Sequence, residues 1–122
     1  MLRPRKKFTV YDLQQLKGKR CLTHIHVKSP EEAAAAAEAG VDLMSCSFDS
    51  LESQARFPKI VEAAPNSFIS CATPHGLASS DQAIRIAFSA MELGASSIYC
   101  SCSLKIIEAM ANERIPVVGH IG

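Results

Sequence analysis

Two segments of the chain, EAGVDLMSCS at residues 38–47 and ELGASSIYCS at residues 92–101, share the pattern Glu-x-Gly-x5-Cys-Ser. In each segment the glycine is a helix stop signal, and the apolar run that follows is typical of a buried strand. A third apolar run also ends in a serine and a cysteine, within SCA at residues 70–72. Repeated helix-to-strand units predict a parallel sheet, because parallel strands need long crossover connections between them.

The other segments continue this alternation of helices and strands. Ser29, Pro30 and Glu32 form a strong helix start signal, with the serine as N-cap and the glutamate completing a capping box. Thr9 and Asp12 form a weaker capping pair. The sequence predicts strands at 20–27, 41–47, 66–72, 95–101 and 115–122, and helices at 9–18, 29–40, 49–65, 79–94 and 103–114.

Two details of these helices can be predicted from residue type. Pro58 lies within the third helix and should interrupt it or begin a new turn, because proline has no backbone N–H to donate. The fourth helix places Ile84, Phe88 and Met91 on one side, so these three residues are predicted to form its apolar face.

Length and charge limit the classes of protein to which the chain can belong. Its 122 residues suffice for one domain, 1–122, with residues 1–8 predicted as a flexible basic tail. A net charge of +1 argues against a nucleic-acid partner. The sequence has no apolar run of about 20 residues and no signal-peptide pattern, which predicts a cytoplasmic protein without membrane association. The five cysteines are then expected to stay reduced.

The segments FTVYDLQQLKGKR, EAGVDL and RIPVVGHIG are similar to the N-terminal half of the ketopantoate hydroxymethyltransferase (3-methyl-2-oxobutanoate hydroxymethyltransferase) family. The resemblance implies a (β/α)8 barrel, a fold that needs about 250 residues. The expected fold is therefore a partial TIM barrel, with about five parallel strands and helices outside. A fragment of a longer protein, two copies that together complete a barrel-like homo-oligomer, and a compact open sheet are alternative explanations of the length.

The resemblance also implies a function. The family transfers a hydroxymethyl group from methylenetetrahydrofolate to a small oxoacid in pantothenate biosynthesis, with Mg²⁺ holding the oxoacid and a glutamate as the base. That glutamate lies beyond the GHIG strand in the family, so this chain is not expected to catalyse the reaction alone. Two alternatives stay open: another carbon–carbon lyase or mutase of the phosphoenolpyruvate mutase and isocitrate lyase superfamily, and a non-catalytic interaction protein.

Matching the family motif predicts a substrate-binding set at the carboxyl ends of the strands, with no catalytic residue among its members: Asp49, Ser50, Ser101 and His120. Asp49 is also the expected Mg²⁺ ligand, although it could instead be the N-cap of the next helix, with Glu52 three residues on. The chain diverges at the rest of the metal site. Ala72 occupies the place of a second family carboxylate, and Tyr99 and Ser101 occupy the places of a lysine and a glutamate.

Cysteines and histidines near the strand ends suggest a second kind of metal site. Thiolates and imidazoles suit Zn²⁺, and the sequence brings together Cys46, Cys71, Cys100, Cys102, His24, His26 and His75. The chain has no Cys-x2-Cys motif, and cysteine is often a small buried residue, so a zinc site is not expected. The alternation of THIH places both of its histidines on one face of a strand, either the barrel interior or the helix side.

Overall fold

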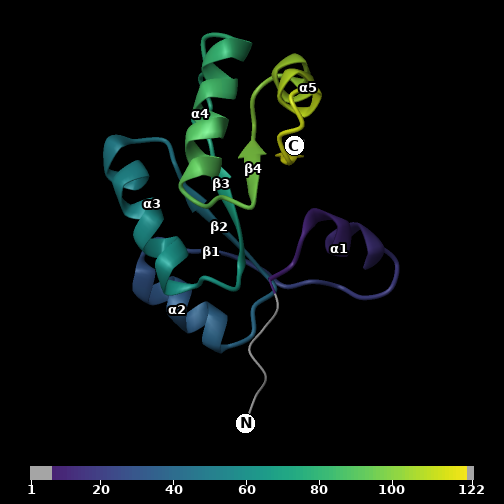
Figure 1. Ribbon diagram of the computed structural model, residues 1–122, viewed down its shortest axis with the longest axis vertical. Helices are drawn as coiled ribbons and strands as arrows, with labels where there is room; N and C mark the ends of the chain where they lie inside the picture. The colour runs from purple at the N-terminus through teal and green to yellow at the C-terminus, as the bar shows by residue number, and fades with distance from the viewer. Residues whose placement is uncertain (1–6, 121–122) are drawn as a thin grey trace.

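The computed structural model describes residues 7–120. Helices and strands alternate along the chain, as the sequence predicts (Figure 1). The helices are α1 (Val10–Gln15), α2 (Pro30–Glu38), α3 (Leu51–Ala63), α4 (Ser80–Glu92) and α5 (Leu104–Asn112). The strands are β1 (His24–His26), β2 (Leu43–Ser47), β3 (Phe68–Ala72), β4 (Ser97–Cys100) and β5 (Val117–Gly119). The first and last strands are shorter than the predicted segments 20–27 and 115–122.

The strands form one parallel sheet in the order β1-β2-β3-β4-β5. Each strand is therefore paired with the strand that follows it in the sequence, after a helical crossover. Cys46 pairs with Cys71, and Ala72 pairs with Tyr99. All of these strands point the same way, so their carboxyl ends meet at one edge of the sheet. The prediction of an α/β fold with five parallel strands is confirmed.

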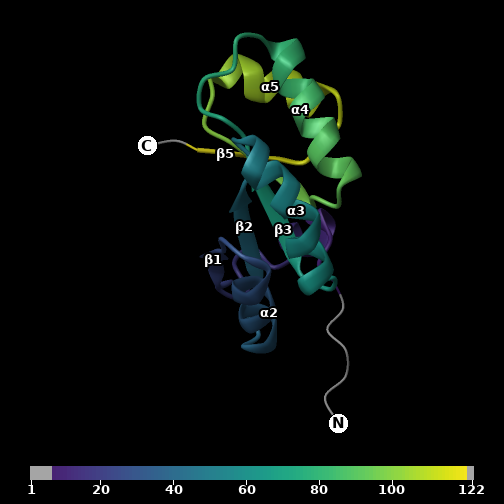
Figure 2. The same cartoon turned by 90° about the vertical axis from the view of Figure 1, so that its left-hand side faces the viewer.

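The helices α2 to α5 cover one face of the sheet. Met44 and Cys46 of β2 and Ile69 and Cys71 of β3 point to this face and are fully buried there. They form one apolar core with side chains from the four helices, among them Ala36, Phe57, Ala87 and Met110. Figure 1 shows α2, α3 and α4 along one side of the sheet, and Figure 2 shows α4 next to α5.

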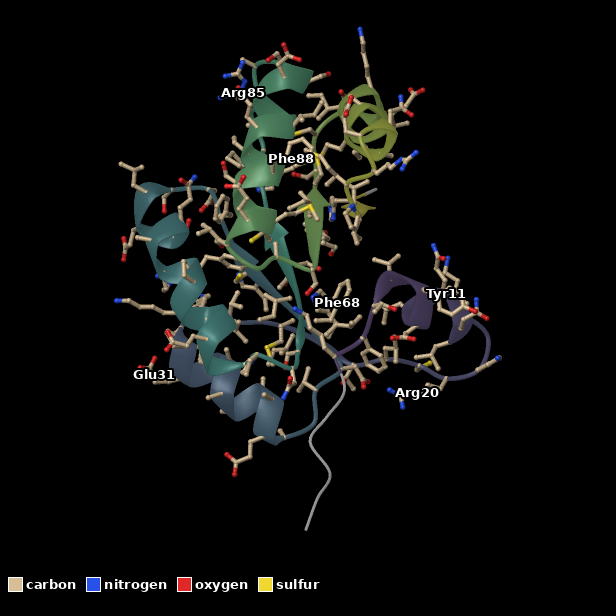
Figure 3. All side chains as sticks on the ribbon, viewed as in Figure 1. Tyr11, Arg20, Glu31, Phe68, Arg85 and Phe88 are labelled. Atoms are coloured by element: carbon tan, nitrogen blue, oxygen red, sulfur yellow. The ribbon has the colours of Figure 1, made fainter. Side chains whose placement is uncertain are left out.

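The opposite face of the sheet is covered only in part, by α1. Val10 and Leu13 of this helix line a cavity of about 250 Å³ together with Leu43, Phe68 and Val118 of the sheet. Figure 3 shows Phe68 on the side of the sheet that faces α1. The two faces therefore differ: the helix face is closed by apolar packing, and the other face, here called the open face, has cavities.

Capping explains most of the helix starts. Thr9 and Asp12 form the predicted capping box of α1. Ser29 caps α2 as predicted, but the Glu32 carboxylate accepts from the N–H of Lys28 at 2.8 Å instead of from the cap residue. The predicted capping box of α2 is therefore wrong in its second half.

The glycines of the repeated pattern end their helices by adopting left-handed backbone conformations. Gly40 has φ +82° and Gly94 has φ +112°, values that side-chain-bearing residues rarely adopt. A Cβ atom at Gly94 would also lie 2.9 Å from Cγ1 of Val61. The chain can thus turn from each helix directly into the strand that follows.

One prediction about the helices is wrong, and another holds only in part. Helix α3 runs through Pro58 without a break, because the buried side chains of Phe57 and Ile60 anchor the turns on both sides of the proline. In α4, Ile84 and Met91 pack against the core as predicted, whereas Phe88 is 45 % exposed. The fully buried residues of this helix are Ala83, Ala87 and Ala90. The small alanines allow this helix to approach the sheet closely, which turns the larger residues towards its edges.

Of the predicted basic tail, residues 1–8, the structure describes only residues 7 and 8. Residues 1–6 and 121–122 lie outside the described residues, so the greater part of the predicted basic tail is not tested. Phe8, which the prediction included in that tail, contacts the guanidinium of Arg20, whose Cζ atom lies 5.9 Å from the ring centroid. Within residues 7–120, none of the helices has the length and hydrophobicity of a membrane span.

Candidate functional site

A cavity of about 420 Å³ opens on the open face, at the carboxyl ends of the strands. This is the edge at which ligands bind in α/β folds. The volume lies in the range of small-molecule sites, about 300–1,000 Å³. Side chains from four strands and the loops after them line the cavity: His24, His26, Ser45, Ser47, Asp49, Ala72, Thr73, His75, Tyr99 and Ser101. We call it the strand-end cavity.

The Ser-Cys triplets at the strand ends explain why this cavity is polar. Successive side chains of a strand point to opposite faces. In β2, Cys46 points into the helix-side core, so Ser45 and Ser47 point to the open face and line the cavity. In β4 the same alternation places Cys100 in the core and Tyr99 in the cavity. Cys46 and Cys100 therefore belong to the core, and Ser45 and Ser47 belong to the candidate site.

Imidazole–hydroxyl pairs occur at several points of the site. His26 Nδ1 lies 3.1 Å from the hydroxyl oxygen of Ser45. His75 Nδ1 lies 2.5 Å from the hydroxyl oxygen of Ser101. Just outside the lining residues, His120 Nδ1 lies 2.5 Å from the hydroxyl oxygen of Tyr99. The chain has four histidines in total, so all of them lie in or next to this cavity.

The structure brings together part of the predicted substrate-binding set. Asp49 and Ser101 line the strand-end cavity. His120 lies next to it through its hydrogen bond with Tyr99. Ser50 does not line it, because its hydroxyl accepts from the N–H of Ser53 as the N-cap of α3. The alternative prediction that Asp49 is this N-cap is therefore wrong by one residue.

Most of the cysteines do not face the cavity. Cys46, Cys71 and Cys100 are buried in the core, on the opposite face of the sheet. The neighbouring Cys46 thiol, followed by burial, raises the pKa of Cys71 above its ordinary value. Cys71 is therefore held as the neutral thiol. The expectation that these cysteines are small buried residues is therefore confirmed for Cys46, Cys71 and Cys100.

The residues of the cavity do not fit the Mg²⁺ ion that the family resemblance implies. Mg²⁺ requires oxygen ligands, and the resemblance implies carboxylates from more than one strand. Asp49 is the acidic residue among those that line the cavity, and the hydroxyl of Ser53 lies 3.3 Å from its Oδ1 atom. Among residues 7–120, no group of three or more His, Cys, Asp or Glu side chains is arranged to hold a metal ion.

Sequence reasoning missed several residues of the site or left them open. Thr73 was missed, and His75 was named only as a member of the zinc set. Both belong to the TPHG segment after β3, which has the composition of a simple turn. Their place at the end of a predicted parallel strand is the signal that could have identified them. His24 and His26 were predicted to share one strand face, and the structure shows that it is the open face and not the helix side.

No model of a known protein family matches the chain, and no curated protein matches it. The resemblance to the ketopantoate hydroxymethyltransferase family therefore stays a prediction.

Proposed function

We propose that the chain is part of a (β/α) barrel and that its strand-end cavity binds a small 2-oxoacid. Two features support a barrel-type scaffold: the strands pair in sequence order, and α2 to α5 pack on one face of the sheet. In a barrel the open face would be the interior, and the strand-end cavity would be the mouth at which ligands bind.

The side chains of the cavity are chemically suited to an oxoacid. A 2-oxoacid carries a carboxylate and a neighbouring keto oxygen, and both accept hydrogen bonds. The cavity offers hydroxyl donors from Ser47, Thr73, Tyr99 and Ser101 at one end of the sheet. A convergent set of hydroxyl groups in a cavity of about 420 Å³ is the observation that carries the proposal.

The described residues do not supply the rest of the hydroxymethyl transfer chemistry. The metal would stabilise the enolate of the oxoacid, and among the described residues that line the cavity only Asp49 offers a carboxylate to hold it. The glutamate base of the family lies beyond the GHIG segment. We therefore assign to this chain the binding of the oxoacid, and to the complete barrel the one-carbon transfer from methylenetetrahydrofolate in pantothenate biosynthesis.

Calorimetric titration with 3-methyl-2-oxobutanoate tests this proposal. We expect saturable binding that does not require Mg²⁺, and weaker binding of 3-methylbutanoate, which lacks the keto oxygen. Tyr99→Phe should weaken oxoacid binding about tenfold or more, because hydrogen bonds to charged groups contribute roughly 1.5–3 kcal/mol. Tyr11→Phe is the matched control, since Tyr11 is 68 % exposed on α1 and does not line the strand-end cavity.

Equal affinity for the two acids, or equal loss in both tyrosine variants, would contradict binding at this cavity. An assay for ketopantoate formation with methylenetetrahydrofolate and Mg²⁺ gives a separate readout. We expect no turnover by this chain, and turnover would show that the missing groups are supplied in another way.

A second candidate function is a non-catalytic interaction protein, favoured by the exposed edges of the sheet. Ile25 on the edge strand β1 is 44 % exposed, and Val118 on the edge strand β5 is 46 % exposed. Apolar edge strands with unpaired backbone groups favour association, including the formation of a homo-oligomer. Sedimentation showing concentration-dependent association, together with no oxoacid binding in the titration, would favour this function.

A further inference from the structure

The pairing of His75 with Ser101 gives the strand-end cavity the components of a nucleophilic site. His75 Nδ1 lies 2.5 Å from Ser101 Oγ, within the distance at which a base activates a serine. We propose that Ser101 is an acyl-accepting nucleophile, that His75 is its general base, and that the substrates are activated esters of small carboxylic acids. This proposal does not depend on oxoacid binding.

The two loops that carry this pair are held together by other contacts. The N–H of Thr73 donates to the carbonyl oxygen of Tyr99 at 3.1 Å, which continues the pairing of β3 with β4 beyond the strand ends. Cys102 Sγ lies 3.5 Å from the carbonyl oxygen of Pro74 and 3.6 Å from that of His75. These contacts on both sides of the pair position the imidazole against the hydroxyl.

The state of Cys102 is consistent with this positioning role. Burial, followed by the nearby Cys100 thiol, raises the pKa of Cys102. The thiol therefore keeps its proton and donates to the carbonyl oxygens of the opposite loop. Ser101 remains accessible, because its side chain is half-buried and lines the cavity, while His75 is exposed.

Helix α5 gives the site a source of positive potential. It begins at Leu104, three residues after Ser101, and its N-cap is Ser103. The N-terminus of a helix carries a partial positive charge that stabilises nearby negative charge. An oxyanion formed on an acyl group at Ser101 would arise next to this end of the helix, where such stabilisation is useful.

The reaction uses groups present in the chain and water as the co-substrate. Ser101 Oγ attacks the ester carbonyl while its proton passes to His75 Nδ1, which requires the imidazole to carry its other proton on Nε2. The carbon–oxygen bond to the leaving alcohol breaks, and the alcohol takes the proton from His75. Water then hydrolyses the acyl-serine, which releases the carboxylic acid and restores both residues.

Hydrolysis of p-nitrophenyl acetate tests the proposal. We expect the wild-type chain to release p-nitrophenol and to carry an acetyl group on Ser101, located by mass spectrometry of a quenched reaction. Ser101→Ala should remove the adduct and lower the rate about 10²-fold, and His75→Gln should lower the rate by a similar factor, as expected for loss of a general base. Ser89→Ala is the matched control, because Ser89 is exposed on α4, away from the cavity.

Circular dichroism spectra identical to wild type would show that the variants are folded. The proposal is overturned if Ser101→Ala hydrolyses the ester at the wild-type rate, or if the acetyl group is found on His24 or His26 instead of Ser101. The oxoacid titration has a separate readout, so failure of one proposal leaves the other testable.

Discussion

Replacing Phe57 by alanine is expected to lower the free energy of unfolding by about 3–5 kcal/mol, the range found for aromatic residues removed from cores. Phe57 is fully buried and lies at the centre of the packing between α3 and the sheet. Its ring contacts that of Phe48 edge to face, with centroids 5.7 Å apart. Urea denaturation followed by circular dichroism measures the change. The total free energy of unfolding of a small domain is about 5–15 kcal/mol, so this variant should lose a large part of its stability.

Leu51→Ala is the control for this experiment. Leu51 lies on the same helix but is 87 % exposed, so its replacement should change the free energy of unfolding by no more than about 0.5 kcal/mol. If both variants lost a similar amount of unfolding free energy, the side of α3 that carries Phe57 would not be packed against the sheet. That result would contradict the assignment of the helix face.

Alkylation by iodoacetamide is expected to divide the five cysteines into distinct groups. Cys21 is exposed and should react first. Cys46, Cys71 and Cys100 are buried in the core, so their reaction requires the protein to open. Because opening costs at least about 5 kcal/mol, these thiols should react about 10³-fold or more slowly than Cys21. Digestion and mass spectrometry at successive times measure the rate at each position.

The pH dependence of this labelling follows from the raised pKa of Cys71. The thiolate is the reactive form, so Cys71 should stay unreactive even as the pH approaches 9.0, the ordinary value for a thiol. Above that pH an unfolded thiol ionises and the folded one does not, so the folded protein loses stability as the pH rises. Rapid native labelling of the three core cysteines would contradict their place on the helix face. Denaturant is the control, since it should make all five reactive.

The alternation of helices and strands could be predicted because its signals are local. Gly40 and Gly94 end helices through backbone conformations that glycine adopts at low cost. Ser29 caps its helix through a hydrogen bond to a residue three positions away. Pro58 was predicted wrongly, because the packing of Phe57 and Ile60 against the sheet outweighs the lost backbone hydrogen bond.

The assignment of the two sheet faces could not be made from the sequence. In a triplet such as Ser45-Cys46-Ser47 all three side chains are small, so strand alternation predicts opposite faces without showing which face the helices cover. The structure assigns the cysteine to the core and the serines to the cavity. The contact of His75 with Ser101 was harder still to predict, because it joins two loops that are 26 residues apart in the sequence.

The most direct test of the account is to locate an oxoacid on the protein by nuclear magnetic resonance. The isotope-labelled chain would be titrated with 3-methyl-2-oxobutanoate while the backbone amide signals are followed. We expect the largest shifts at Ser47, Thr73 and Ser101, around the strand-end cavity. Shifts that are absent, or that concentrate at Leu13 and Phe68 beside α1, would contradict the claim that this end of the sheet is the ligand site.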